Sequence, residues 1–165
     1  MTKTMQNLQE AFAGESQANR KYLAFAKQAD AEGFKQAAKL FRAAAEAETV
    51  HAHSHLKVMG GIGSTQENLK VAVAGETHEF MSMYPGMIAE AEQEKNAQAV
   101  RTFTLANEVE KVHAGLYQKM LDSLSKEGEM FDYFVCSVCG HTVEKSAPEK
   151  CVVCGAVNRA FMQVS

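Results

Sequence analysis

The sequence of one predicted helical hairpin occurs twice in this chain. Residues 41–52 align with residues 103–114, and seven of the twelve positions are identical. The segments before them match as well, because residues 11–16 align with residues 72–77. The offset between the copies is 61 residues in the earlier segment and 62 in the later one. Two such hairpins packed face to face would be related by an approximate two-fold axis, so residues at matching heights would meet at a shared centre.

The composition of residues 4–126 is that of helices, with one proline and many Ala, Glu, Lys, Gln, Leu and Met residues. Glycines and Asn96 divide the stretch into four predicted helices, at about 4–29, 33–59, 66–95 and 97–125. The sequence Ser64-Thr65-Gln66-Glu67 fits a capping box that begins the third helix. Four long helices of similar length predict a bundle, which we assign to residues 1–128.

The duplicated helices carry oxygen and nitrogen donors at matching heights: Glu15, Glu48, His51, Glu76, Glu110 and His113. Each Glu-x-x-His pair presents its two side chains on one helix face. One Glu from each of two helices, with Glu-x-x-His from each of the other two, is the ligand pattern of di-iron carboxylate bundles. Four buried carboxylates without cations would repel one another and lose their solvation. The pattern therefore predicts a site for two cations, and carboxylate with imidazole suits iron or manganese.

Two neighbouring acidic residues are predicted to take no part in this site. On an ideal helix, Glu46 and Glu108 point roughly 200° away from the glutamates that follow two residues later. We therefore expect both on the outer faces of their helices.

The end of the chain has a different character. Residues 131–135 are aromatic and β-branched, which predicts a short strand. Two Cys-x-x-Cys-Gly motifs follow, and their cysteines are Cys136, Cys139, Cys151 and Cys154. Four thiolates can surround one tetrahedral metal, and zinc ribbons use the same spacing, so iron and zinc both remain open. A domain of about 35 residues, assigned to 131–165, should depend on its metal to fold.

With these motifs along essentially its whole length, the chain resembles the rubrerythrins. The resemblance implies an all-α four-helix ferritin-like bundle plus a small C-terminal rubredoxin-like four-cysteine metal domain. It implies that Glu48 and Glu110 bridge two irons, and it favours iron in the four-cysteine site. It also implies that Glu79 ligates the first iron in the oxidised state and that His51 replaces it on reduction. Glu79 has no counterpart in the first repeat, where the matching residue is Ala18.

Two tyrosines are further candidates for the catalytic site. Tyr22 follows Glu15 by seven residues and so lies on nearly the same helix face, where it could hydrogen-bond a ligand carboxylate. Tyr84 follows Glu76 by eight residues, and an ideal helix turns that position about 80° from Glu76. Pro85 comes next and is expected to distort the helix. Core packing is the alternative role for both tyrosines.

The resemblance implies a non-haem di-iron peroxidase that reduces hydrogen peroxide to water in oxidative-stress defence. Electrons would pass through the rubredoxin-like iron centre from rubredoxin or an NAD(P)H-dependent reductase. One alternative is a ferroxidase or iron-storage bundle with a structural zinc domain. Another is a zinc-stabilised interaction module without turnover.

Charge and hydropathy exclude other classes. A net charge of −3 offers no basic field for nucleic acid. No apolar run approaches the roughly 20 residues that span a bilayer, and residues 1–6 show no apolar signal segment. We therefore expect no nucleic-acid or membrane partner and a cytoplasmic location.

The link between the two hairpins predicts the assembly. A crossover inside one bundle must run back roughly 30 Å along the helices, judged from the helix lengths beyond Glu48 and before Glu76. Residues 60–65 reach only about 24 Å. Either the third helix starts later or its hairpin packs with another chain, and we favour a domain-swapped homodimer.

Overall fold

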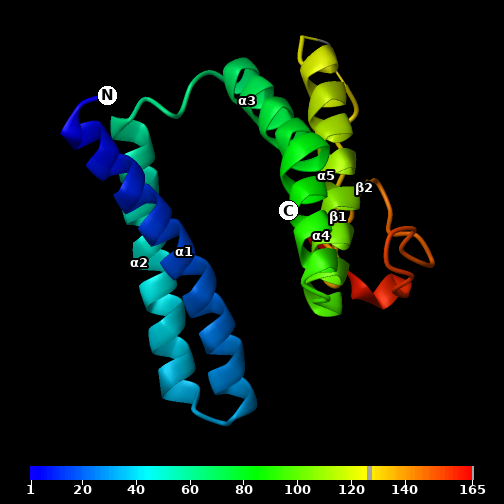
Figure 1. The fold of residues 1–165 in the computed structure, drawn as a ribbon, viewed down its shortest axis with the longest axis horizontal. Coiled ribbons are helices and arrows are strands. Elements are labelled where there is room, and N and C mark those ends of the chain that lie inside the picture. Colours follow the sequence, from blue (N-terminus) through cyan, green and yellow to red (C-terminus); the bar gives the residue numbers. More distant parts are fainter. Residues whose placement is uncertain (126–127, 165) are drawn as a thin grey trace. The chain divides into compact units, whose positions relative to one another are not determined.

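The computed structural model describes residues 1–125 and 128–164. The chain divides into two compact units, Met1–Gly63 and Ser64–Ser165 (Figure 1). The predicted bundle at 1–128 and the predicted cysteine domain at 131–165 include residues 126, 127 and 165, which lie outside the described part. Within that part, no helix combines the length and the apolar character that crossing a membrane requires.

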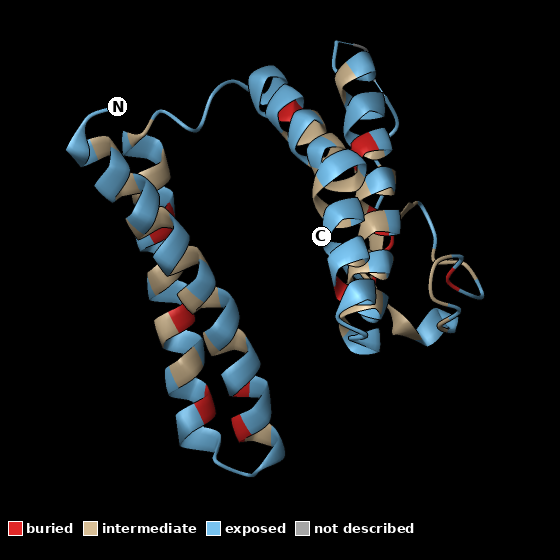
Figure 2. Cartoon of the chain, in the orientation of Figure 1, coloured by how far each residue is buried: buried red, intermediate tan, exposed pale blue. Residues whose placement is uncertain are grey.

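The first unit is one helical hairpin, made of α1 (Lys3–Ala31) and α2 (Lys35–Val58). Gly33 has a φ of 87° and makes the turn between them. The buried side chains along the two helices are all small: Ala26, Ala29, Ala38, Ala45 and Ala52 (Figure 2). Asn19 donates from Nδ2 to the Ala45 carbonyl at 2.7 Å and to the Thr49 hydroxyl at 2.9 Å. Alanine contacts and this polar bridge therefore hold the hairpin together.

The second unit begins with the other helical hairpin. Its helical elements are α3 (Thr65–His78), the π-helix η1 (Glu79–Met83), α4 (Tyr84–Gln93) and α5 (Ala97–Ser123). The predicted capping box is present, because Ser64 accepts from the Glu67 amide and the Glu67 side chain accepts from the Ser64 amide. Together α3, η1 and α4 correspond to the third predicted helix. The π-helix η1 interrupts its α-helical geometry shortly before Pro85.

The π-helix takes up the one extra residue of the second repeat. The offset between the copies is 61 residues from Glu15 to Glu76 and 62 from Tyr22 to Tyr84. In a π-helical turn one residue is added to the turn, so Tyr84 lies about 20° from the Glu76 face instead of about 80°. The rotation of about 80° applies only to an ideal helix, and the distortion expected near Pro85 is present as this π-helix. Pro85 contributes, since it lacks the amide that a regular α-helical turn would use.

The rest of the second unit is a three-stranded antiparallel sheet with strand order β2-β1-β3. The strands are β1 (Tyr133–Cys136), β2 (Thr142–Glu144) and β3 (Phe161–Val164), and the 3₁₀-helix η2 (Asn158–Ala160) precedes β3. The predicted strand at 131–135 corresponds to β1. The sheet contacts α5 through an ion pair between Lys119 and Glu144, so the cysteine region packs on a helix of its own chain.

Candidate metal centre

The first unit contains one cluster of possible metal ligands. Glu15, Glu48 and His51 each offer a donor atom, and these atoms lie within 4.8 Å of one another. The Nδ1 atom of His51 is 2.9 Å from Oε2 of Glu48. The Glu48 side chain is 18% exposed and the His51 side chain 55% exposed. The Glu-x-x-His spacing thus brings carboxylate and imidazole together, as the sequence predicts.

The second unit repeats this arrangement with Glu76, Glu110 and His113, again with donor atoms within 4.8 Å of one another. Here Nδ1 of His113 is 2.7 Å from Oε2 of Glu110 and 4.0 Å from Oε1 of Glu76. In both copies the histidine turns Nδ1 toward the glutamate three residues earlier. The duplication therefore extends from the sequence to the orientation of the donor atoms. Glu46 and Glu108 are exposed, as expected for outer-face residues.

The electrostatics of the second cluster favour a bound cation. Burial, followed by the hydrogen bond and the charge of Glu110, raises the pKa of Glu76 to about 7. Without a metal, two adjacent carboxylates therefore hold on to a proton that a divalent cation would displace. Carboxylate oxygens with one imidazole nitrogen form a donor set that iron and manganese accept. The residues of each cluster fit one cation of the pair that the sequence predicts.

The proton held by Glu76 should make stability depend on pH. The prediction applies to protein whose carboxylate site is metal-free and whose four-cysteine site holds zinc. Because the folded-state pKa of Glu76 lies above the ordinary 4.5, folded protein binds more protons than unfolded protein between these values. Stability should then fall as pH rises through this window. With allowance for a side chain that is 20% exposed, we expect a loss of about 1–3 kcal/mol.

Urea unfolding of the wild type and of Glu76→Gln, from about pH 4.5 to pH 8, would measure the loss. The variant has no carboxyl group at this position but keeps every histidine. Subtracting its pH dependence of unfolding free energy from that of the wild type therefore removes the histidine contributions. Equal pH slopes for both proteins would contradict the raised pKa.

Glu79 and Tyr84 lie beside the second cluster. Glu79 is the first residue of the π-helix, and its charge adds to the raised pKa of Glu76. Burial, then the charges of Glu110, Glu79 and Glu76, raise the pKa of Tyr84. The phenol therefore lies within electrostatic reach of three carboxylates and is the side chain that the π-helix restores to this face.

The aromatic surroundings of the two tyrosines repeat as well. The ring centroids of Tyr22 and Phe41 are 6.2 Å apart, and those of Tyr84 and Phe103 are also 6.2 Å apart. Phe25 adds a further contact to Tyr22, at 6.3 Å. Each tyrosine thus packs against a phenylalanine of the paired helix, so core packing contributes to the placement of both.

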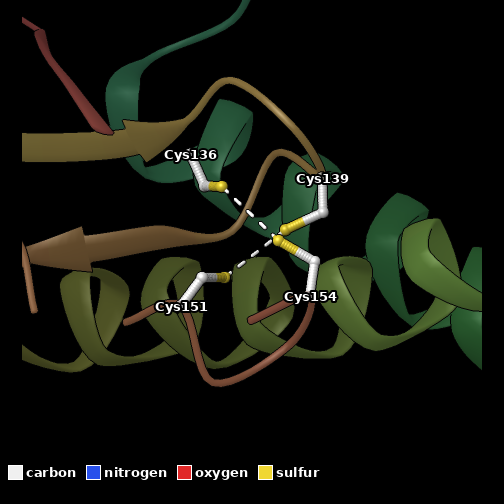
Figure 3. A group of neighbouring side chains, drawn as sticks. All are labelled: Cys136, Cys139, Cys151 and Cys154. Atoms are coloured by element: carbon white, nitrogen blue, oxygen red, sulfur yellow. Dashed lines mark hydrogen bonds between the residues drawn. The ribbon is translucent and has the colours of Figure 1, made fainter. Parts of the chain in front are cut away.

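The four cysteines form a separate site (Figure 3). Cys136 Sγ is 3.7 Å from Cys154 Sγ, and Cys139 Sγ is 3.6 Å from Cys151 Sγ. A tetrahedron with metal–sulfur bonds of about 2.3 Å has edges of about 3.8 Å, whereas a disulfide bond is about 2.05 Å long. The four thiols are free and their spacing is that of a tetrahedral metal site.

The backbone around the thiols is arranged in two matching turns. Gly140 donates its amide to the Cys136 carbonyl at 2.8 Å, and Gly155 donates to the Cys151 carbonyl at 2.9 Å. Both glycines have positive φ, 86° and 76°, which explains the glycine after each Cys-x-x-Cys. Burial raises the pKa of Cys139. Burial opposes ionisation of Cys151 too, but the amides of Cys154 and Val153 outweigh it and lower the pKa of that thiol.

One contact was not foreseen from the sequence. Thr142, in the cysteine domain, lies with its hydroxyl oxygen 2.9 Å from Nε2 of His113. The two residues are 29 positions apart, and no local pattern marks a threonine of this kind. Glu76, His113 and Thr142 also line a cavity of about 490 Å³ whose other walls are largely apolar side chains of α3, α5 and the sheet.

A duplicated helical hairpin with carboxylate–histidine clusters and an appended tetrathiolate site defines the class of protein: a non-haem di-iron protein with its own four-cysteine metal domain. Comparison with known proteins agrees. Residues 6–121 match the rubrerythrin family, and residues 134–162 match the rubrerythrin rubredoxin-like domain. The chain belongs to the rubrerythrin family.

Individual relatives are similar over nearly the whole chain. Rubrerythrin-2 of Clostridium acetobutylicum is 34% identical, covering 93% of this chain and 92% of its own. Nigerythrin of Nitratidesulfovibrio vulgaris is 33% identical, covering 92% and 81%. A structure of the partially reduced state of nigerythrin covers 99% of this chain and 88% of its own, with 32% identity and a TM-score of 0.60.

These findings confirm the predicted resemblance, the fold class and the cofactors. The chain combines a ferritin-like helical part with a rubredoxin-like domain. Its cofactors are two irons in a carboxylate-bridged site and one iron or zinc in the four-cysteine site. Family membership also makes it a di-iron oxidoreductase of oxidative-stress defence.

Proposed function

We propose that this protein is a peroxidase that reduces hydrogen peroxide to water. The observation that carries the proposal is the packing of the four-cysteine domain on α5, the helix that holds Glu110 and His113. A storage or ferroxidase bundle has no evident need for a one-electron centre beside its carboxylates. We also propose the division of the chain into a bundle at 1–128 and a metal domain at 131–165.

The reaction consumes two electrons and two protons for each peroxide, and it releases two molecules of water. An iron pair bound here would supply the two electrons that break the O–O bond, and an iron held by the four cysteines would return electrons one at a time. The proposed ligands of the pair are Glu15, Glu48, His51, Glu76, Glu110 and His113, with Glu48 and Glu110 bridging. The proposed ligands of the single metal are Cys136, Cys139, Cys151 and Cys154.

Two further residues adjust the site during the proposed cycle. Glu79 would ligate the oxidised pair and His51 the reduced pair, so a carboxylate charge would match the higher charge of the oxidised metals. The phenol of Tyr84, whose pKa is raised further above neutrality, would donate a hydrogen bond toward a ligand carboxylate. Tyr22 takes the equivalent role in the first repeat.

Glu79→Ala tests the exchange. We expect the variant to retain its metals and to lose about 10- to 100-fold in peroxide turnover, because six ligands remain while the oxidised state loses one carboxylate. Metal content and steady-state turnover measure the two effects. Glu90→Ala is a matched control on an exposed position of α4. Full turnover in Glu79→Ala would refute the exchange.

Rapid mixing of the fully reduced protein with peroxide and, separately, with oxygen tests the function itself. We expect faster oxidation by peroxide, followed by a rise in the visible absorption of the four-cysteine iron as it gives up its electron. Faster oxidation by oxygen would favour the ferroxidase alternative. Inertness toward both, with zinc in every site, would favour the interaction module.

We further propose rubredoxin or an NAD(P)H-dependent reductase as the electron donor and the cytoplasm as the location, since thiolate metal sites persist in reducing compartments. The proposed assembly is a domain-swapped homodimer, in which the hairpin of one chain completes the site of the other. Its motivation is the short link at residues 60–65.

Co-expression of Glu48→Ala and Glu110→Ala chains tests the swap. In a swapped heterodimer one site carries both substitutions and the other carries none, so a random mixture should recover about a quarter of the wild-type sites. Without swapping, every site carries one substitution. No recovery in a verified heterodimer would refute the swapped assembly.

A further inference from the structure

We propose that Thr142 is a positioning residue that fixes the imidazole of His113 from the four-cysteine domain. Thr142 begins β2, three residues after Cys139, and its Oγ1 is 2.9 Å from Nε2 of His113 on α5. The other ring nitrogen of His113, Nδ1, faces Glu110 at 2.7 Å. One side chain of the cysteine domain therefore holds the ring whose opposite edge enters the carboxylate cluster.

The acceptor group next to Thr142 determines the direction of its hydrogen bonds. Its hydroxyl oxygen is 3.1 Å from the Gly140 carbonyl oxygen, and a carbonyl oxygen can only accept. The single hydroxyl proton of Thr142 therefore goes to Gly140. The Thr142 oxygen is left to accept from His113, which places the ring proton on Nε2. This leaves a lone pair on Nδ1 for a cation shared with Glu110, whose acceptor-only carboxylate lies 2.7 Å away and cannot itself hydrogen-bond that lone pair.

Other contacts between the cysteine domain and α5 lie on either side of Thr142. Lys119 pairs with Glu144, two residues after Thr142 in β2. Gly140 lies against Val109, since a Cβ atom at Gly140 would be 3.7 Å from the Val109 side chain. Val109, His113 and Lys119 all belong to α5, so the domain meets one stretch of this helix on both sides of His113.

The two histidines of the repeat differ in a way that fits this role. The His113 side chain is 26% exposed and the His51 side chain 55% exposed. The lower exposure of His113 reflects the cover that Thr142 and the sheet give it within its own unit. A second consequence rests on the proposed function: Cys139, Gly140, Thr142 and His113 form a path of covalent and hydrogen bonds along which an electron can reach the carboxylate site.

The experiment compares the full-length wild type with Thr142→Val, Thr142→Ser and Lys119→Ala. Zinc in all metal sites keeps the protein diamagnetic, so that ¹⁵N-labelled histidine rings can be followed by NMR. We expect a slowly exchanging Nε2 proton on His113 in the wild type and in Thr142→Ser. Its exchange should be about 2- to 10-fold faster in Thr142→Val, which keeps the shape of threonine but cannot accept a hydrogen bond.

Metal affinity gives the second readout. Chelator competition should show a loss of about 10-fold or more at the carboxylate site in Thr142→Val, with the four-cysteine site unchanged. Lys119→Ala removes the neighbouring ion pair but keeps the His113 contact, so it should resemble the wild type. Equal losses of affinity in Lys119→Ala and Thr142→Val would show that docking of the domain alone matters and would overturn the proposal. Unchanged proton exchange and unchanged metal affinity in Thr142→Val would overturn it as well.

The electron path has its own measurement. In the iron-loaded protein, Thr142→Val should slow oxidation of the four-cysteine iron after peroxide is added, whereas Thr142→Ser should not. Neither ring exchange nor zinc affinity depends on turnover, so failure of the peroxidase proposal would leave these two results intact.

Discussion

Glu110→Ala is expected to empty the carboxylate site and to lower peroxide turnover by at least about 100-fold, since loss of a ligand should exceed the 10- to 100-fold effect of losing a ligand's hydrogen-bond partner. The Glu110 side chain is 17% exposed, and its Oε2 lies 2.7 Å from His113 Nδ1. Without this carboxylate, only Glu76 and His113 remain in the second cluster. The carboxylate predicted to bridge the two cations is then missing, so the binding of both cations is weakened.

Glu108→Ala is the matched control, because Glu108 is exposed on the same helix and points roughly 200° away from Glu110. It should leave iron content and turnover unchanged. Glu110→Ala should also lower the pKa of Glu76 in metal-free protein, because the hydrogen bond and charge that raise it are removed. Retention of two irons per carboxylate site in Glu110→Ala would contradict the assignment of this residue.

Cys151→Ser is expected to unfold the cysteine domain and spare the helices. The domain contains three strands of four, three and four residues, and so small a sheet is marginal by itself. Metal binding at such sites contributes about 10–16 kcal/mol to folding. Cys151 is buried, with its sulfur 3.6 Å from that of Cys139, so an oxygen in its place disrupts the tetrahedron.

Amide NMR spectra measure this effect residue by residue. Signals from residues 133–164 should collapse to unfolded positions in Cys151→Ser, while signals from α1 and α2 should persist. Val152→Ala, at a side chain that is 81% exposed in the same turn, is the control and should retain the folded sheet. A folded sheet in Cys151→Ser after removal of metal would show that the domain does not depend on its metal.

Much of the site could be predicted because it depends on patterns that are local in the chain. The Glu-x-x-His spacing places Glu48 with His51, and Glu110 with His113, on one face of any α-helix. The Cys-x-x-Cys-Gly motifs make matching turns for the same reason, since Gly140 and Gly155 occupy positions of positive φ. The capping box at Ser64 likewise needs only four consecutive residues.

Tyr84 shows where local periodicity fails. The sequence contains the extra residue between Glu76 and Tyr84, but an ideal helix converts it into a rotation of about 80°. The molecule instead absorbs it in the π-helix Glu79–Met83, which keeps Tyr84 beside the carboxylates. A wider turn costs some hydrogen-bond quality, and contacts such as that between Tyr84 and Phe103 offset the cost.

The sequence by itself determined the donor atoms: the carboxylates, imidazoles and thiols, their helix faces and their turns, because each depends on neighbours within a few residues. Only the tertiary structure decided the protonation and the long-range hydrogen-bond partners of these groups. It brings Thr142 to His113 across 29 residues, and it buries Glu76 beside Glu110 so that one proton is retained. Such effects depend on distances between elements, which packing sets and which no periodicity along the chain encodes.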